Sequence, residues 1–282
     1  MALAKAGAKV YITGRTLVAG TAVPGTLPGT AAEVTAAADA TGLGGSCIAC
    51  ACDHADDAAT RAVFERIKSE NGGRLDVVVC NAYGAVGQAL HGKHWWERES
   101  AEHYDASCVV GLRSNYLCSL LAARAMTRRR CGLIVNVSSF GALRAYTSVP
   151  YAISKSATDR MVADCAPDLR SFGVAIVSLW PGLIKTERLL QSKRGGKIGR
   201  SKAAESPEYV GRAIVALAAD GDAALARTGK VVMSHELGAE FGFVDTDGNT
   251  PRDKVMQSLR SEMESPPVFW QPDWPGYVRP KL

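Results

Sequence analysis

Residues 131–159 read CGLIVNVSSFGALRAYTSVPYAISKSATD and decide the interpretation of the rest of the chain. The run 133–137 is apolar except for one Asn and rich in β-branched residues, and Ser138 and Ser139 follow it. This pattern predicts a buried strand with hydroxyl groups at its carboxyl end. In open α/β sheets, ligands bind at the carboxyl ends of the strands.

A helix is predicted directly after this strand and its loop. Pro150 suits the first turn of a helix, and the four-residue spacing of Tyr151 and Lys155 puts both on one face. A hydroxyl, a phenol and an ammonium group are therefore expected to converge on one pocket.

Length, charge and cysteine content narrow the class of protein. A chain of 282 residues suits one large α/β domain with a full core. The net charge of +5 is mild, and the basic residues are scattered apart from 128–130, which argues against a nucleic-acid-binding stripe. The 8 cysteines form no recognisable extracellular framework and are expected to be reduced thiols. We identify no signal peptide and expect no membrane span.

Strand and helix patterns alternate at least five times, which predicts a Rossmann-type, doubly wound parallel sheet. We assign residues 1–235 to this domain and residues 236–282 to an irregular extension. Residues 16–32 are expected to form a surface insertion, with helices at 31–40 and 101–126. Further strands are predicted at 9–13, 46–52, 75–80, 174–180 and 230–234, and a mobile loop over the substrate at 191–206.

The spacing Tyr-x-x-x-Lys is common by chance, but here it stands in an ordered series of motifs. Asp53 follows a predicted strand, Cys80-Asn81-Ala82-Tyr83 follows the next, and the opening stretch supplies Asn136-Val137-Ser138-Ser139 and the Tyr–Lys pair. Pro181-Gly182 and Thr186 complete the series. In this order the motifs resemble the short-chain dehydrogenase/reductase family over residues 2–234, and several strings resemble one particular branch of it.

The resemblance implies roles for these residues. Tyr151 would be the general acid or base, Lys155 would hold the nicotinamide ribose, and a serine would orient the substrate oxygen. Strand register favours Ser139 and the family's usual spacing favours Ser138, so both remain candidates, with a preference for Ser139. The same resemblance assigns cofactor contacts to Asp53, Asn81, Pro181, Gly182 and Thr186.

Arg15 bears on the choice of cofactor. It follows the second strand of the expected fold, where an acidic residue would bind the ribose of NAD and an arginine would meet the 2′-phosphate of NADP. We therefore predict NADP, with NAD as the alternative. A metal site near Cys47, Cys50 and His54 is not expected, because an extended strand puts those two cysteines on opposite faces.

Two departures from the family pattern stand out. Gly111 takes the place of an asparagine that supports a proton relay in the family. No Gly-x-x-x-Gly-x-Gly phosphate loop occurs in the sequence, and by the resemblance it would precede Met1. We therefore expect a truncated chain whose sheet, in the strand order 3-2-1-4-5-6, lacks its central strand and is split in two.

Two functions follow as hypotheses. The first is an NADP-dependent carbonyl reductase or alcohol dehydrogenase that acts on a small molecule and, by resemblance, forms a homo-oligomer. The alternative is a non-enzymatic binding or scaffold protein that keeps the site residues without the phosphate loop. A cytoplasmic location is expected first, and a peroxisome-like organelle second, from the Pro-Lys-Leu at the C-terminus.

Overall fold

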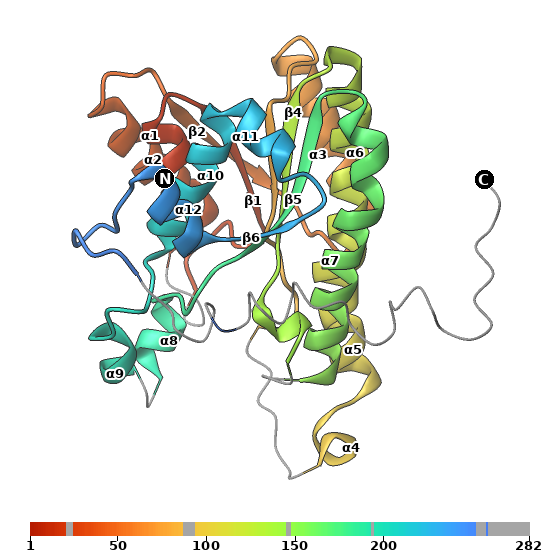
Figure 1. The fold of residues 1–282 in the computed structure, drawn as a ribbon, viewed down its shortest axis with the longest axis vertical. Coiled ribbons are helices and arrows are strands. Elements are labelled where there is room, and N and C mark those ends of the chain that lie inside the picture. The colour runs from red at the N-terminus through yellow and green to blue at the C-terminus, as the bar shows by residue number, and fades with distance from the viewer. Residues whose placement is uncertain (21–24, 87–93, 145–147, 193–194, 252–257, 259–282) are drawn as a thin grey trace, which may run out of the picture.

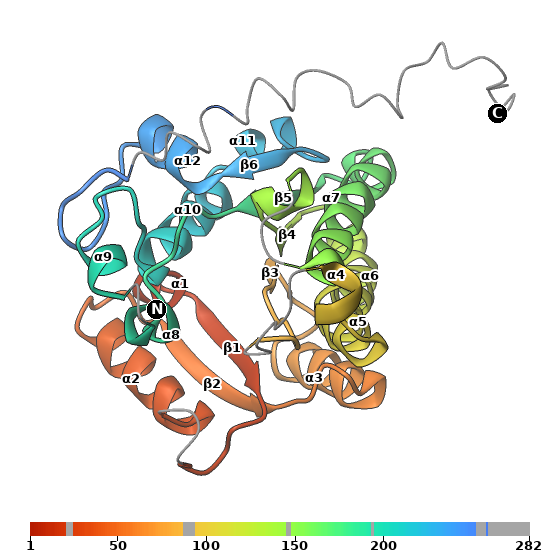
Figure 2. The same cartoon turned by 90° about the horizontal axis from the view of Figure 1, so that it is seen from below.

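A computed structural model describes residues 1–282 apart from 21–24, 87–93, 145–147, 193–194, 252–257 and 259–282. It shows an α/β architecture with helices on both faces of parallel strands (Figures 1 and 2). The expected fold class is confirmed.

The described strands form two sheets in which every paired neighbour is parallel. The two-stranded sheet has the order β1-β2 and the four-stranded sheet the order β3-β4-β5-β6. The predicted division of the sheet is therefore observed. The strands are β1 (Lys9–Gly14), β2 (Ser46–Ala51), β3 (Val77–Cys80), β4 (Gly132–Val137), β5 (Val174–Trp180) and β6 (Val231–Met233).

The helices account for most of the remaining described chain. A π-helical turn, η1 (Val109–Arg113), separates α5 from α6, and a 3₁₀ turn, η2 (Phe140–Ala142), follows β4. The α-helices are α1 (Ala2–Lys5), α2 (Leu27–Asp39), α3 (Asp57–Glu70), α4 (Trp95–Arg98), α5 (Ala101–Cys108), α6 (Ser114–Arg129), α7 (Val149–Arg170), α8 (Glu187–Gln191), α9 (Gly195–Gly199), α10 (Pro207–Ala219), α11 (Gly221–Ala226) and α12 (Ser234–Phe241).

The main core covers both faces of the four-stranded sheet. Leu133 and Val135 of β4 pack with α10, α11 and α12, whereas Ile134 packs on the other face with α6 and α7. All seven residues of β5 are buried. This burial on two sides explains why these strands appear in the sequence as continuous apolar runs.

Helices rather than strand hydrogen bonds connect the two sheets in the described chain. α1 packs against α10, with Lys5 Nζ 3.1 Å from Glu208 Oε1, and α3 packs against α6. Arg113 and Asp57 form an ion pair beside the second contact.

Two helix predictions are corrected. α2 begins four residues before the expected position, because the Thr26 side chain accepts a hydrogen bond from Gly29 N and caps the helix. The single helix expected at 101–126 is interrupted at η1, where Val110 and Gly111 leave helical geometry.

One apolar run bears on the expectation of no membrane span. By length and composition alone, the run Ala101–Arg129 is apolar enough to cross a membrane. In the structure it is broken at η1, and α6 packs against β3, β4 and α7. This packing is typical of a core helix.

Candidate active site

The two candidate serines at the end of β4 have different surroundings. The Ser138 hydroxyl is buried and donates to Lys155 O at 3.3 Å, within the body of α7. The Ser139 Oγ accepts a hydrogen bond from Gly141 N at 2.9 Å, which leaves its proton available to another acceptor. This geometry favours Ser139 for contact with a substrate.

Tyr151 and Lys155 come from the first turns of α7. The helix begins after Ser148, whose Oγ accepts a hydrogen bond from Tyr151 N at 3.2 Å. Pro150 occupies the first turn, as expected. The N-cap therefore fixes the backbone from which the Tyr151 phenol extends.

Lys155 is buried, with 6% of its surface exposed. Its Nζ donates to Val137 O at 2.9 Å and lies 5.7 Å from the centre of the Tyr151 ring. Burial lowers the pKa of Lys155 to about 8, an effect opposed by the nearby carboxylate of Asp159.

Asp159 lies one helical turn after Lys155 and ties α7 to β5. Its carboxylate accepts hydrogen bonds from the Ser178 hydroxyl and from Trp180 Nε1, the latter at 3.1 Å, and the Ser138 hydroxyl is within reach. Burial raises the pKa of Asp159 to about 6, although these donors and Lys155 act to lower it. The lysine and its carboxylate partner are therefore held in one network.

Gly141 leaves room for the ring of Tyr151. A Cβ atom at this position would lie 2.7 Å from Tyr151 Cε1 and 3.2 Å from Ser139 Oγ. The Ser139 hydroxyl and the edge of the Tyr151 ring thus border the same small space.

Arg15 and Asp53, which are predicted to bind the adenosine half of the cofactor, lie on the two-stranded sheet. Arg15 follows β1 and Asp53 follows β2, with Arg15 Nη1 3.5 Å from Asp53 Oδ2. A hydrogen bond from Ala55 N lowers the pKa of Asp53, and Arg15 contributes in the same direction. Asn81 follows β3 and is exposed. All of these residues stand at carboxyl ends of strands, but the structure assigns them to two separate sheets.

The loop after β5 is anchored by a buried carboxylate. Gly182 N donates to Glu205 Oε1 at 3.1 Å, and the Ser234 hydroxyl donates to the same carboxylate at 2.7 Å. Thr186 caps α8 by accepting a hydrogen bond from Leu189 N. Pro181 is buried beside this loop.

Sequence reasoning missed four contributors: Tyr83, Gly141, Asp159 and Glu205. Tyr83 appeared only as part of a motif, yet its ring lies 5.5 Å from that of Tyr151. The four-residue spacing from Lys155 was a signal for Asp159. Gly141 and Glu205 carry no local signal, because their roles depend on contacts between distant segments.

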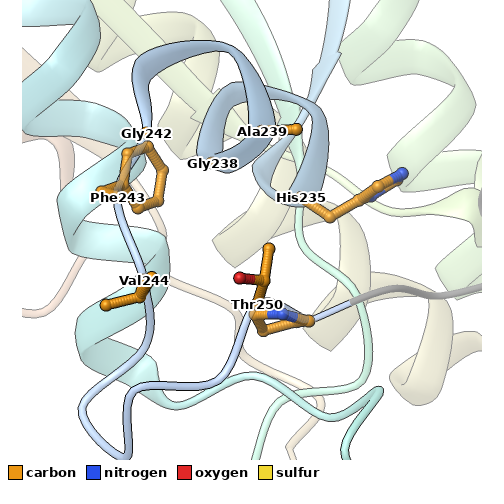
Figure 3. A pocket seen from close by; sticks show the side chains of 8 residues that line it. His235, Gly238, Ala239, Gly242, Phe243, Val244 and Thr250 are labelled. Atoms are coloured by element: carbon orange, nitrogen blue, oxygen red, sulfur yellow. The ribbon is translucent and has the colours of Figure 1, made fainter.

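A cavity of 430 Å³ lies apart from the predicted residues. It is lined mainly by α12 and the segment after it, including His235, Phe243, Val244 and Thr250 (Figure 3). None of the predicted site residues lines it.

Comparisons with known proteins show the family to which the chain is related. Residues 1–195 match the family model described as short chain dehydrogenase. The chain is 42% identical to dehydrogenase/reductase SDR family member 1 of Mus musculus, over 98% of this chain and 88% of the mouse protein. It is 39% identical to the Homo sapiens protein of the same name, over 91% of this chain and 81% of the human protein. This is the branch indicated by strings such as Asn81-Ala82-Tyr83.

Solved structures give the same fold. A short-chain dehydrogenase/reductase from Serratia marcescens superposes with a TM-score of 0.64 at 27% identity, covering 82% of this chain and 88% of that one.

Proposed function

Because the chain belongs to the short-chain dehydrogenase/reductase family, we propose that it is an NADP-dependent oxidoreductase that reduces a carbonyl or oxidises an alcohol. The observation that carries the proposal is the convergence of Ser139, Tyr151 and Lys155 at the carboxyl end of β4.

Each of the three side chains has a distinct task. In the direction of reduction, the Tyr151 phenol donates a proton to the substrate oxygen, and in oxidation it accepts one. The Lys155 ammonium stabilises negative charge on the phenol, and the Ser139 hydroxyl donates a hydrogen bond that orients the substrate oxygen. The nicotinamide, when bound, supplies or accepts the hydride.

The preference for NADP rests on Arg15. Its side chain is 72% exposed, and within the described chain its guanidinium forms a long contact of 3.5 Å with Asp53. Exposed ion pairs of this kind contribute little energy, so the guanidinium is available to a 2′-phosphate. Lys155 and the Gly182 loop would hold the nicotinamide half.

Two features favour a second function. The sequence contains no Gly-x-x-x-Gly-x-Gly segment, and the described strands are divided between two sheets. A binding or scaffold protein that keeps the site residues as a relic would show these features. Micromolar binding of NADPH to the 282-residue chain, measured by calorimetry, would argue against it.

Turnover tests the proposed function directly. We expect NADPH oxidation with members of a panel of ketones and aldehydes, and a loss of about 10²-fold or more in kcat for Tyr151→Phe, since general acid catalysis contributes this much. Tyr104→Phe is the control, because Tyr104 is an exposed residue of α5. Equal activity of the parent and Tyr151→Phe would contradict the assignment.

A further inference from the structure

Tyr83 occupies space that a side chain at position 111 would need. A Cβ atom at Gly111 would lie 2.8 Å from Tyr83 Cδ2, and Gly111 has a φ of 151°, a value that favours glycine. The aromatic ring and the glycine are therefore complementary.

The interruption of the helix at η1 fits the segment that carries Tyr83. Gly84 N donates to Val110 O at 2.7 Å, and a Cβ atom at Gly84 would lie 2.5 Å from Ala106 O. Single π-helical turns inside helices often mark functional sites. Here the π-helical turn packs closely against the segment after β3.

The Tyr83 side chain reaches the residues of the proposed reaction. Its ring centre lies 5.5 Å from that of Tyr151, with the planes at 88°, and 5.4 Å from Lys155 Nζ. Its hydroxyl lies 3.0 Å from Ser107 Oγ, which fixes the far end of the ring. Lys155 Nζ is thus near the rings of both tyrosines.

We propose that Tyr83 is a positioning residue whose ring, docked against Gly111, holds the Lys155 ammonium beside the phenol of Tyr151. The inference rests on the proposed function, because Tyr83 acts through the two residues that would perform the chemistry. Its hydroxyl serves mainly to orient the ring.

The Tyr83 ring is expected to stabilise the charged form of Lys155. An aromatic face attracts a cation and favours its charged form, most strongly where water is excluded. Burial disfavours the charged form of Lys155, and Asp159 is the charged group that opposes this in the described chain. Tyr83 adds a second favourable interaction from a segment outside α7.

The test compares variants of Tyr83 that change the aromatic ring, the hydroxyl group or the strength of the cation–π attraction one at a time. Tyr83→Leu removes the aromatic face, whereas Tyr83→Phe keeps it and loses only the contact with Ser107. Phenylalanines of increasing fluorination at position 83 weaken the cation–π attraction while preserving shape, so they keep the test valid if the leucine variant folds poorly.

The first readout needs no turnover. With [ε-¹³C]lysine in the full chain and Lys155→Arg for assignment, NMR titration gives the midpoint of Lys155. We expect this midpoint to fall by about half to one pH unit in Tyr83→Leu, to fall stepwise with fluorination, and to stay unchanged in Tyr83→Phe. An unchanged midpoint across the leucine and fluorinated variants would overturn the proposal.

The second readout is the pH profile of kcat. In Tyr83→Leu the alkaline limb should move to lower pH, so that activity relative to the parent is about two- to sixfold lower at pH 8.5 than at pH 6.5. A uniform loss at both pH values would indicate a purely structural role. Absence of turnover in the parent would count against the proposed function, while the NMR titration would still decide the role of Tyr83.

Discussion

Neighbouring residues at the end of β4 acquire different roles through their partners. Ser138 is turned into the protein and bonded to the α7 backbone, whereas Ser139 borders the space next to Tyr151. Because successive side chains of a strand alternate in direction, one of the two hydroxyls faces the site and the other does not.

Gly141 offers a test of this narrow space. We expect Gly141→Ala to displace the Tyr151 ring and to reduce kcat by about tenfold or more, since misplacement of a catalytic group by 1 Å can cost about 10². The measurement is steady-state turnover together with the melting temperature. Gly221→Ala is the control, because nothing lies within 4 Å of a Cβ atom there. Full activity of Gly141→Ala would show that the ring can move without consequence.

The sequence predicts the candidate catalytic residues more readily than the residues that support them. Tyr151 and Lys155 share a helix face, so their spacing alone brings them together. Asp159 meets Trp180 only because α7 packs on β5 in one particular register. That register depends on the packing of the whole sheet, which no local pattern encodes.

At the scale of elements, Asp159 links a helix to a strand through hydrogen bonds. It joins α7 to β5 through Ser178 and Trp180, immediately before the loop at Pro181. The position of α7, and with it that of Lys155, therefore depends on a carboxylate that is partly protonated near neutral pH.

Because the pKa of Asp159 is raised in the folded protein, we expect the free energy of unfolding to depend on pH. The folded-state pKa of Asp159 is about 6, above its ordinary value of 3.8. The folded protein therefore binds this proton more tightly, and the stabilisation is full below pH 3.8 and is lost as the pH rises through about 6. Relative to Asp159→Asn, the parent should gain at most about 3 kcal/mol in free energy of unfolding between pH 7 and pH 4.

Urea unfolding at several pH values measures this difference. Asp164→Asn is the control on the same helix, because Asp164 is exposed and pairs with Arg160. If the free energy of unfolding changed with pH in the same way in the parent and in Asp159→Asn, the proposed role of Asp159 would be contradicted.

Prediction of the helices succeeded where the signals were local. The first turn of α7 was expected from Pro150. The break at η1 was not expected, because it depends on the segment carrying Tyr83, which packs against Gly111 from elsewhere in the chain.

At the scale of the whole molecule, the division of strands between two sheets is the dominant feature. This division was predictable, because a parallel Rossmann sheet without its central strand is left with two sets of strands that share no backbone hydrogen bonds. In the described chain, β1 is paired only with β2, and β3 only with β4, whereas β5 is paired on both sides.

Hydrogen exchange should reveal this difference. Amides of β5 are expected to be the most protected, and those of β1 and β3 to exchange considerably faster, because one side of each has no strand partner. Peptide-level exchange measured by mass spectrometry distinguishes the strands, with buried α10 as an internal reference for the intact fold. Equal protection of β1 and β5 would mean that the open sides are covered in solution.

The anchoring of Glu205 also has a consequence for how the chain can vary. This carboxylate has no exposed surface and joins the loop at Gly182 to Ser234, the first residue of α12. The division between 1–235 and 236–282 expected from the sequence therefore falls inside a helix that begins at this anchor. Loss of the Ser234 hydroxyl would remove a donor from a buried carboxyl group, so substitutions at Ser234 and in the Gly182 loop should be tolerated only in matching pairs. Grafting a segment of a relative that begins at Ser234 onto this chain should succeed only when the Gly182 loop of that relative is transferred as well.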